Sequence, residues 1–514
     1  MIIKIKAEFP IGDLLYANKS IQDDSGNWNG IITNIGILNR SISYKNAYEE
    51  SGFSVTFSDK NRYFRDMMSS STNKLISGKK VTGYTEDNTQ EYTGTVSSWS
   101  YPKDGFTINI TDKLSGINDK INNTITIAEF SGTVNDSIGN FIPVIYGVKE
   151  DTLGTLKCWQ TSTGSYLVAR HHCKSIDNIF EDGAEISSGW SIDNNADGYC
   201  YVTYAGGTED YIVINVSGSM DISDNLITEP IEALRDLIDN YCSMDYGVAS
   251  FLTSEAVMQQ RNYVINSIIT SETLAGYMKN FCYSFASTWF VKKNNRIKID
   301  TDGTFTSSII GQLKNSSNSS DVLKGTLRTN EDLSNMVNVL QVFNKFNHYK
   351  NEYKNKPVKT DTNSVANYGS FFEEYYIKCT SDTDTIDHVT TNYISQKKNP
   401  IIKTYFSTRI KPLLDLSAGI LGNIITFADY SGVTTSAQKY KVMRMGISFS
   451  GEFVQLELLK LYPEGGCFIL GDETTLSADW DTATSLEREY GYLGDETTGF
   501  FSNGYDPDKV LCSE

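Results

Sequence analysis

The stretch Phe141-Ile-Pro-Val-Ile-Tyr-Gly-Val-Lys-Glu-Asp151 decides how the chain is divided, because the composition changes directly after it. Pro143 has no N–H to donate, which suits the start or the edge of a strand. Gly147 permits a bend in the backbone. The apolar run is too short for a domain and too apolar for an ordinary loop. We therefore interpret it as a hinge strand between a first β domain and an inserted β module.

Upstream of this stretch, the pattern predicts β-structure. Residues Phe53–Ser58 alternate apolar with polar side chains, so one face of that strand is expected to be buried. A hairpin is expected from the arms Thr93–Trp99 and Phe106–Ile110, with turn residues at Tyr101–Gly105. A short helix is expected at Asn61–Met68. Short strands at close spacing predict a small barrel or sandwich.

Downstream, a Gly- and Ser-rich segment predicts a small inserted β module. Its expected strands are Ser165–Ala169, Ile176–Ile186, Cys200–Tyr204 and Tyr211–Val216. The spacing of apolar residues then becomes that of a helix. Thr228 is expected to cap a helix that has Pro230 in its first turn, and a second helix is expected over Ser271–Phe285. A hairpin over Trp289–Ile299 is expected to follow.

The last third of the body predicts a second β domain. A polar linker is expected at Gln312–Val322, a central strand at Met336–Phe343 and a long excursion at residues 349–370. A closing meander follows. Its expected parts are a strand at Asn423–Ala428, a loop at 430–439, a strand at Tyr440–Phe449 and a return strand containing Val454, Leu456 and Leu458.

Together these patterns predict a mainly β protein with a smaller α+β part. The expected units are two β-barrels, an inserted small β module, a helical or α+β domain and an acidic C-terminal appendage. Their expected boundaries are 1–135 for the first barrel, 136–222 for the module, 223–320 for the α+β domain, 321–462 for the second barrel and 463–514 for the appendage.

The net charge of −18 argues against a protein that binds nucleic acid through counterion release or binds an anionic membrane surface. Residues 464–514 hold twelve acidic and two basic side chains, so −10 of the −18 lies there. No run of eighteen apolar residues and no signal-peptide pattern is present, which predicts synthesis and folding in a cytoplasm and no membrane span.

The sequence offers little for chemistry. The eight cysteines form no CxxC pair and are interpreted as reduced, partly buried thiols. The adjacent His171, His172 and Cys173 suit a strand or turn better than a zinc site. His348 and His388 lie in polar segments and are expected at the surface. No nucleotide-binding, metalloprotease or serine-hydrolase motif is present, and carboxylate pairs arise by chance among 63 Asp and Glu. We therefore predict no enzyme, no cofactor and no metal site.

The C-terminal fifty residues contain a short repeat. Leu470–Thr475 recurs as Leu493–Thr498, with aromatic residues between and after the copies. We interpret the appendage as a docking segment for a partner, and the alternative is a weakly ordered acidic extension. The acidic residues here, including Asp506 and Asp508, lack the spacing of an EF-hand and are interpreted as turns and caps. The predicted docking residues are Asp472, Glu473, Trp480, Tyr490, Asp495, Glu496 and Phe500.

The order of these segments resembles that of the hub or tail-tip proteins of bacteriophage tails, the baseplate hub family. Ile138-Gly-Asn-Phe-Ile-Pro-Val-Ile-Tyr-Gly147 is similar to a segment of tail-tip proteins of long-tailed phages, and Lys174–Gly183 is similar to the segment that follows it there. The resemblance covers about residues 30–462, and the acidic C-terminus departs from it. Its other carriers are Gly52–Asp59 with Tyr63 and Phe64, Tyr92–Ser98, Thr107–Leu114, Asp332–Val339 and Leu414–Leu461.

The resemblance implies a structural virion protein, synthesised in the host cytoplasm, with two hub-type barrels per subunit. A homotrimer would then present a pseudo-sixfold ring that closes the tail tube and adapts it to a threefold tip. The implied partners are a distal-tail or tube ring, the tape measure protein, and tip or fibre proteins. No stable nucleic-acid binding is implied, since an acidic lumen would let DNA slide.

Two alternatives stay open at this point. One is another baseplate component, such as a distal-tail ring protein or a fibre adaptor, which six copies rather than three would distinguish. The other is a surface protein that binds or cleaves glycans, since the chain is rich in Tyr, Trp and Asp.

Overall fold

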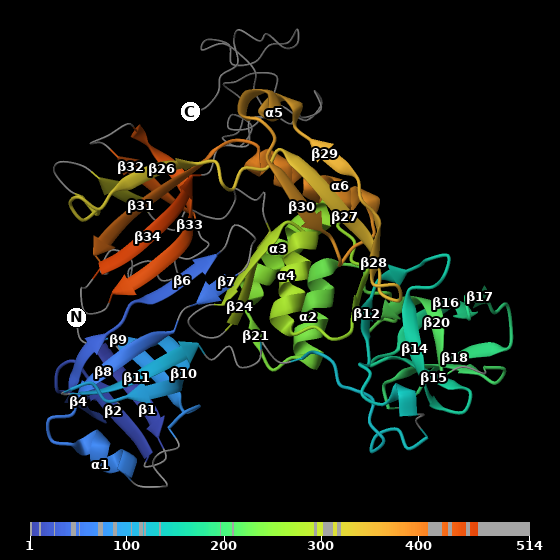
Figure 1. Ribbon diagram of the computed structural model, residues 1–514, viewed down its shortest axis with the longest axis horizontal. Coiled ribbons are helices and arrows are strands. Elements are labelled where there is room, and N and C mark those ends of the chain that lie inside the picture. Colours follow the sequence, from blue (N-terminus) through green and yellow to red (C-terminus); the bar gives the residue numbers. More distant parts are fainter. Residues whose placement is uncertain are drawn as a thin grey trace. The chain divides into compact units, whose positions relative to one another are not determined.

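The computed structural model of the 514-residue chain (Figure 1) describes residues 3–460 apart from internal gaps. Nothing is described for residues 1–2 and 461–514. The internal gaps are 10–11, 25, 43–47, 51, 70–75, 86–89, 104, 113–116, 118–119, 133–134, 196, 208–209, 292–295, 302–311, 316–319, 410–423, 430–433 and 449–452.

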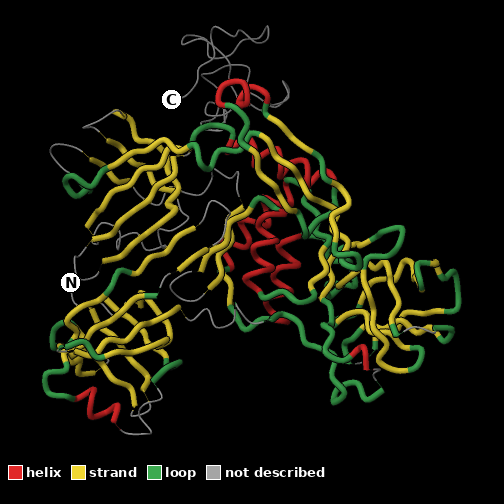
Figure 2. Tube along the Cα trace, viewed as in Figure 1, coloured by secondary structure: helices red, strands yellow, loops and turns green. Residues whose placement is uncertain are grey.

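Alternating apolar and polar residues build the first sheet. In β8 (Phe53–Ser58), Phe53, Val55 and Phe57 are buried, as predicted. β10 (Gln90–Ser100) and β11 (Gly105–Asp112) form the predicted antiparallel hairpin, with a bulge between Val96 and Ser98. The sheet is completed by β1 (Ile3–Phe9), β2 (Gly12–Ala17), β3 (Ile21–Asp23), β4 (Gly26–Gly30), β5 (Ile32–Ile35) and β9 (Lys80–Thr85). Its strand order is β3-β4-β2-β1-β9-β10-β11-β8-β5, and Figure 2 shows it curled.

Helix α1 (Tyr63–Ser69) lies close to its predicted position and packs against this sheet. It buries Phe64, Met67 and Met68, and the ring of Phe64 stacks on that of Phe106 with centroids 4.6 Å apart. Stacked aromatic pairs of this kind add to the burial of apolar surface, so α1 belongs to the core of the first sheet.

The module after the hinge strand is a second, separate sheet. β15 (Ser165–Ala169) and β19 (Cys200–Tyr204) have the predicted bounds, and β20 (Tyr211–Ser219) extends further than predicted. The single strand expected at Ile176–Ile186 is wrong, because Asp182 and Gly183 have positive φ and turn the chain into a hairpin. The remaining strands are β13 (Val148–Lys149), β14 (Leu156–Ser162), β16 (Cys173–Glu181), β17 (Ala184–Glu185) and β18 (Trp190–Asn194).

Helices follow the module along the chain. α2 (Pro230–Tyr241) is present, but the predicted cap Thr228 is wrong: the side chain of Glu229 accepts from the N–H of Glu232 instead. α4 (Leu274–Ser284) is capped by Thr273 and lies within its predicted span. α3 (Val248–Gln260) has no counterpart in the sequence prediction. Beside the helices lies a three-stranded sheet of β21 (Asp245–Tyr246), β23 (Ser287–Val291) and β24 (Arg296–Thr301).

The closing meander forms a third large sheet. Val454, Leu456 and Leu458 are buried on β34 (Phe453–Lys460), as predicted. The linker expected at Gln312–Val322 is wrong in its first part, because β25 (Gln312–Asn315) pairs in parallel with β32 (Ile424–Asp429). The loop expected at 430–439 is also wrong from Thr434 onward, where β33 begins. The sheet includes β26 (Arg328–Asp332), β31 (Ile401–Arg409) and β33 (Thr434–Ser448).

Two strands from the N-terminal region belong to this third sheet. β6 (Leu38–Ile42) pairs antiparallel with β33, and β7 (Tyr48–Glu50) pairs with β6. In sequence, both lie between β5 and β8 of the first sheet. The chain thus passes from the first sheet to the third and back within its first sixty residues. The predicted domain boundaries stay a prediction.

Residues 339–376 form a four-stranded sheet rather than one central strand followed by an excursion. Its strands are β27 (Val339–Asn347), β28 (Glu352–Asn355), β29 (Val358–Thr360) and β30 (Phe372–Tyr376), with α5 (Thr362–Tyr368) between the last two. α6 (Thr383–Lys397) follows and contacts β27; it too was absent from the prediction. The mainly β class with a smaller α+β part is confirmed.

No helix within the described ranges is both long enough and apolar enough to cross a membrane.

The stretch 141–151 contains two short strands, β12 (Val144–Tyr146) and β13, which join different sheets, and β12 is buried on both sides. β12 starts directly after Pro143 and pairs antiparallel with β22 (Ser267–Ile269). Val144 and Tyr146 enter the main core, whereas Ile145 enters the core of the inserted module. A strand whose two faces meet two different cores needs apolar residues at consecutive positions, which explains the uninterrupted apolar run.

Backbone groups hold this strand to its neighbours. The N–H of Gly147 donates to the carbonyl of Ile227 (3.0 Å), and the carbonyl of Gly147 accepts from the N–H of Gly218 (2.9 Å). Gly147 has φ of +68°, and a Cβ there would lie 1.9 Å from the carbonyl oxygen of Ile265. The bend predicted at Gly147 is present. A side chain at this position is excluded both by the positive φ and by the contact with the carbonyl oxygen of Ile265.

We expect Gly147→Ala to lower the free energy of unfolding by about 3 kcal/mol, because the backbone must move away from Ile265 and a left-handed residue is strained. The matched control is Gly139→Ala, where φ is +83° but nothing lies within 4 Å of the added Cβ. That variant should lose about 1 kcal/mol from backbone strain alone. Urea unfolding followed by tryptophan fluorescence measures both, and equal losses would contradict the close approach.

Candidate functional site

The residues predicted to dock a partner lie outside the described part of the chain, so that prediction stays open. They are Asp472, Glu473, Trp480, Tyr490, Asp495, Glu496 and Phe500. Within the described part, the fold brings polar or titratable side chains together in two regions. The first lies around residues 141–151 and includes Lys149, Asp151, His171 and His348. The second is a pocket on the first sheet.

Lys149 lies at the end of the hinge strand and is buried, with 3% of its surface exposed. Burial lowers the pKa of Lys149 to about 8; Cys379 opposes this effect and Lys378 adds to it. Among the ion pairs of the described residues, none involves Lys149, and its charged neighbour Lys378 pairs with Glu272. Burying a charged group without an acidic partner costs free energy, so Lys149 lowers the free energy of unfolding at neutral pH.

His348 belongs to the same centre, and its predicted surface position is wrong. Its ring is half-buried, and Nε2 is fully buried without a hydrogen-bond partner among the described residues. Burial, helped by the charges of Lys149 and Lys378, holds the pKa of His348 well below its usual range. The ring is therefore neutral at pH 7. His388 is exposed, as predicted, and its Nδ1 lies 2.7 Å from the hydroxyl of Tyr263.

The segment Asn347–Tyr349 docks on the loop 151–155 that follows β13: Asn347 is buried and His348 partly buried, whereas Tyr349 is exposed. The N–H of Tyr349 donates to the carbonyl of Thr155 (2.9 Å), and the side chain of Asn347 donates to Asp151 (2.9 Å). Asp151 also pairs with Lys354. Burial alone would raise the pKa of Asp151, but the hydrogen bonds from Lys354 and Asn347 outweigh it and lower the pKa. The loop 151–155 thus joins the inserted module to β27 and β28.

His171 supports the hinge strand from the module side. Its Nε2 accepts from the N–H of Ile145 (2.9 Å), and Nδ1 lies 2.9 Å from the carbonyl of His172. These partners require a neutral ring with the proton on Nδ1. Burial lowers the pKa of His171 to about 4, which agrees with that state. The sequence predicted a strand or turn at His171–Cys173, and the structure has a bend at His171 followed by β16 from Cys173.

The described cysteines behave as core residues. Cys158, Cys173, Cys200, Cys282 and Cys379 are buried free thiols, and Cys242 is partly buried. Burial raises the pKa of Cys379 to about 11, so the thiol stays protonated at neutral pH. In the described part of the chain, His, Cys, Asp and Glu do not gather in groups of three or more at metal-binding distance.

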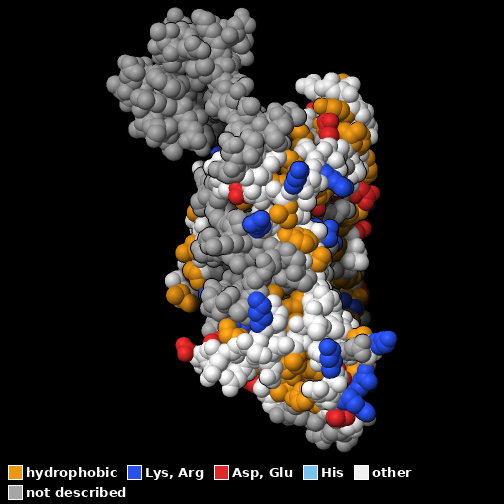
Figure 3. Space-filling model, turned by 90° about the vertical axis from the view of Figure 1, so that its left-hand side faces the viewer, with side chains coloured by type: hydrophobic (Ala, Val, Ile, Leu, Met, Phe, Trp, Pro, Cys, Tyr) orange, Lys and Arg blue, Asp and Glu red, His pale blue; other side chains and the backbone are white. Residues whose placement is uncertain are grey.

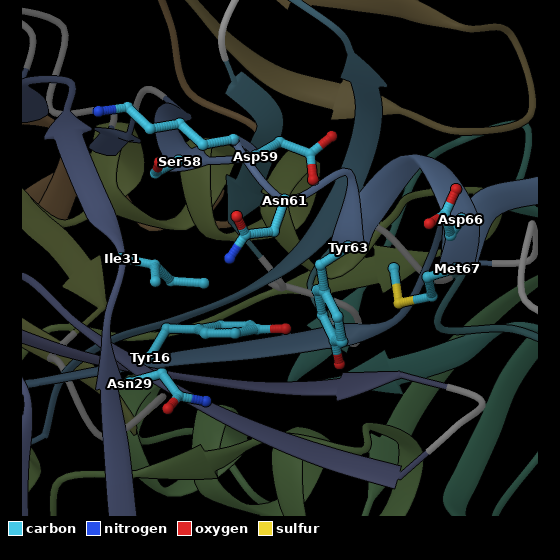
Figure 4. A pocket seen from close by; sticks show the side chains of 10 residues that line it. Tyr16, Asn29, Ile31, Ser58, Asp59, Asn61, Tyr63, Asp66 and Met67 are labelled. Atoms are coloured by element: carbon cyan, nitrogen blue, oxygen red, sulfur yellow. The ribbon is translucent and has the colours of Figure 1, made fainter.

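A pocket of about 650 Å³ opens on the first sheet beside α1 (Figure 4). Its floor holds Tyr16 from β2 and Met67 from α1, and Ile31 forms one wall. Asn61 and Tyr63, from the loop and the first residue of α1, face Tyr16 across the opening. Asn29 completes the lower rim. The sequence analysis missed this site, because its residues come from separate strands and a loop. The only local sign of it in the sequence was the run of polar residues before α1.

The loop that carries the rim of the pocket is held in place by Asp59. The buried carboxylate of Asp59 accepts from the N–H of Phe64 (2.8 Å) and lies 3.5 Å from Nε of Arg65. Its carbonyl accepts from the N–H of Arg62, which has φ of +61°. These contacts fix where Asn61 and Tyr63 stand before any ligand arrives.

The face drawn in Figure 3 mixes basic, acidic and apolar side chains. In the described part of this face, Lys and Arg are scattered among apolar patches, and the fewer Asp and Glu lie mostly toward its edges.

We expect Lys149→Met to raise the free energy of unfolding at pH 7 by about 3 kcal/mol, since the folded pKa of about 8 lies below the ordinary value of 10.5. Below pH 8 both states carry the proton and the cost is complete. Between pH 8 and 10.5 the unfolded state binds more protons, so the wild type gains stability as the pH rises.

The measurement is the unfolding temperature of wild type and variant at several pH values from 7 to 10. The advantage of Lys149→Met should shrink as the pH rises. Lys350→Met, which removes an exposed lysine, is the control and should change nothing. A constant difference at every pH would show that Lys149 is neutral throughout or reaches solvent.

No protein-family model matches the sequence, and no curated protein matches it. Several solved structures are similar to the chain, including these three. The 43 kDa tail protein of prophage MuSo2 from Shewanella oneidensis is 10% identical, with 90% of this chain and 99% of that chain covered and a TM-score of 0.41. The tail protein from Neisseria meningitidis MC58 is 8% identical, with 89% and 96% covered and a TM-score of 0.40.

The third is a chain of the virion of a native gene transfer agent particle, 10% identical, with 64% of this chain and 86% of that chain covered and a TM-score of 0.39. All three carry descriptions as tail or virion proteins.

Proposed function

We propose that this chain is a structural component of a phage tail, and that three copies form the hub of the tail tip or baseplate. The observation that carries the proposal concerns two of the three large sheets: the first and the third are linked, because β6 from the N-terminal region pairs with β33 of the third and β7 pairs with β6. Three copies would present six such sheets, which suits a threefold protein beneath a sixfold tube.

The segments that resemble tail-tip proteins support this proposal by their positions. Gly52–Asp59 contains β8 of the first sheet, and Thr107–Leu114 overlaps β11. Leu414–Leu461 contains the paired strands β33 and β34 of the third sheet. Ile138–Gly147 contains β12, which packs between two cores. The resemblance therefore rests on strands that build the fold rather than on surface loops.

In this proposal the chain carries out no reaction. It closes the tube and anchors tip or fibre proteins, with the distal-tail or tube ring and the tape measure protein as further partners. The location is the virion, after synthesis in the host cytoplasm. Binding specificity comes from sheet edges, loops and the seam between subunits.

We expect the purified chain to form trimers, with a mass near three times 57.4 kDa, about 172 kDa. Mass photometry measures this directly, and the symmetry of the tail tip in electron micrographs tests it in the particle. Six copies would favour a distal-tail ring component instead. A chain that stays monomeric in the presence of its tail partners would contradict both assignments.

The acidic C-terminal segment is proposed to dock a neighbouring tail protein. Deleting residues 466–514 should leave the trimer intact and stop one partner from assembling. Two full-length variants separate the contributions: Ala at Trp480, Tyr490 and Phe500, and amides at Asp472, Glu473, Asp495 and Glu496. Loss in the first alone identifies apolar docking, and loss in the second alone identifies charge recognition. Tails that assemble normally with the truncated chain would contradict the proposal.

A further inference from the structure

The pocket beside α1 contains a buried hydroxyl that lacks a partner. Tyr16 is 2% exposed, and its hydroxyl makes no hydrogen bond with the described residues. The hydroxyl of Tyr63 lies near enough to raise the pKa of Tyr16, mainly set by burial, a little further. Yet the two phenols form no hydrogen bond of standard geometry. In Figure 4 the Tyr16 hydroxyl lies among the pocket-lining residues and points toward Tyr63, with Asn61 above it.

An orphaned hydroxyl of this kind is uncommon in a folded protein, because burying it without a hydrogen bond costs about 1–3 kcal/mol. A site built to hydrogen-bond a ligand explains the cost, since the ligand satisfies the group on binding. The second orphaned atom of the pocket lining is Oδ2 of Asp59, which has the nearby Arg65 but no hydrogen bond.

The walls offer both apolar and polar contacts. The ring of Tyr63 stands at the opening with 47% of its surface exposed, held edge-on to Phe64 at 5.2 Å. Ile31 and Met67 add apolar surface, and the side-chain amides of Asn29 and Asn61 lie at the rim. An exposed aromatic ring next to amides and hydroxyls can take up a ligand that is apolar on one face and rich in hydroxyls at its edge.

The charges favour a neutral ligand. Lys60 and Asp66 at the rim have opposite signs, and Asp59 is matched by Arg65. Two carboxylates so close to the opening disfavour a phosphate or a nucleotide. The volume of about 650 Å³ lies in the usual range for small-ligand pockets.

We propose that this pocket binds one neutral pyranose unit of a saccharide, with its C–H face on the ring of Tyr63 and its hydroxyls on Asn29, Asn61 and the hydroxyl of Tyr16. This role goes beyond the hub function and does not require it. It also involves no cleavage of the saccharide. For a chain placed at a tail tip, such a pocket would contact the saccharides of a cell surface.

The test uses the full-length protein on an array of neutral glycosides of glucose, galactose, rhamnose and N-acetylglucosamine and their short oligosaccharides. The strongest binder is then titrated by calorimetry. Tyr63→Ala should weaken binding at least tenfold, because it removes the stacking surface while leaving the core intact. Tyr16→Phe should weaken it about fivefold, the effect of one hydrogen bond.

The unfolding temperature gives a second readout. Tyr16→Phe should keep or raise it, because the hydroxyl it removes has no partner in the free protein. The matched control is Tyr368→Ala on α5, which removes an aromatic side chain of similar exposure, 43%, far along the sequence and outside the pocket. The control should bind saccharide like the wild type.

Three results would overturn the proposal. The first is that no saccharide on the array binds. The second is binding that Tyr63→Ala and Tyr16→Phe leave unchanged, which would locate the site elsewhere. The third is a marked fall in the unfolding temperature of Tyr16→Phe, which would give the hydroxyl a structural role. The copy number of the protein is independent of all three, so failure here leaves the hub proposal standing.

Discussion

The backbone of Gly147 approaches the carbonyl of Ile265 so closely that no side chain fits between them, and the centre of the described chain depends on this contact. Gly218 makes the same kind of approach to the carbonyl of Ile145, where an added Cβ would lie 2.4 Å away. Two glycines thus let three segments meet through their backbones. Because they do, consecutive side chains of β12 can enter two separate cores, and the inserted module is joined to the helical part by a strand rather than by a loose linker.

Close packing at this joint has an electrostatic consequence. The titratable groups buried around it are neutral or lack an ion-pair partner. His171 accepts a backbone hydrogen bond, and Nε2 of His348 has no hydrogen-bond partner among the described residues. Lys149 has no acidic partner among the described residues. Specific hydrogen bonds and one ion pair at Asp151 hold the neighbouring segment in place. The joint therefore draws its stability from apolar burial and backbone hydrogen bonds, and Lys149 reduces it. A structural role in an assembly requires a defined geometry of this kind, whereas catalysis would require the titratable groups to face a substrate.

Local signals predicted the elements that depend on a few consecutive residues. β8, the β10–β11 hairpin and α4 were predicted because alternation, turn residues or a helical stripe is complete within each segment. α3 was missed since its apolar residues do not form one stripe: Val248 and Leu252 are exposed whereas Phe251 is buried. α6 buries Ile386, Val389, Tyr393 and Ile394 at helical spacing, so a local signal for this helix was present and was overlooked. β25 contains polar residues and exists because β32, more than a hundred residues later, supplies its hydrogen bonds. Long-range pairing of this kind overrides local propensity.

By itself, the sequence determined the mainly β class and the lack of recognisable catalytic motifs, because composition, period and turn residues are local properties. Tertiary structure alone decided that β6 and β7 belong to the third sheet, that Nε2 of His348 is buried and that Tyr16 meets Asn61 and Tyr63 in a pocket. Each of these depends on partners far apart in the chain. A residue's own neighbours in sequence carry no record of which distant strand or side chain will lie beside it once the backbone hydrogen bonds and the cores have formed.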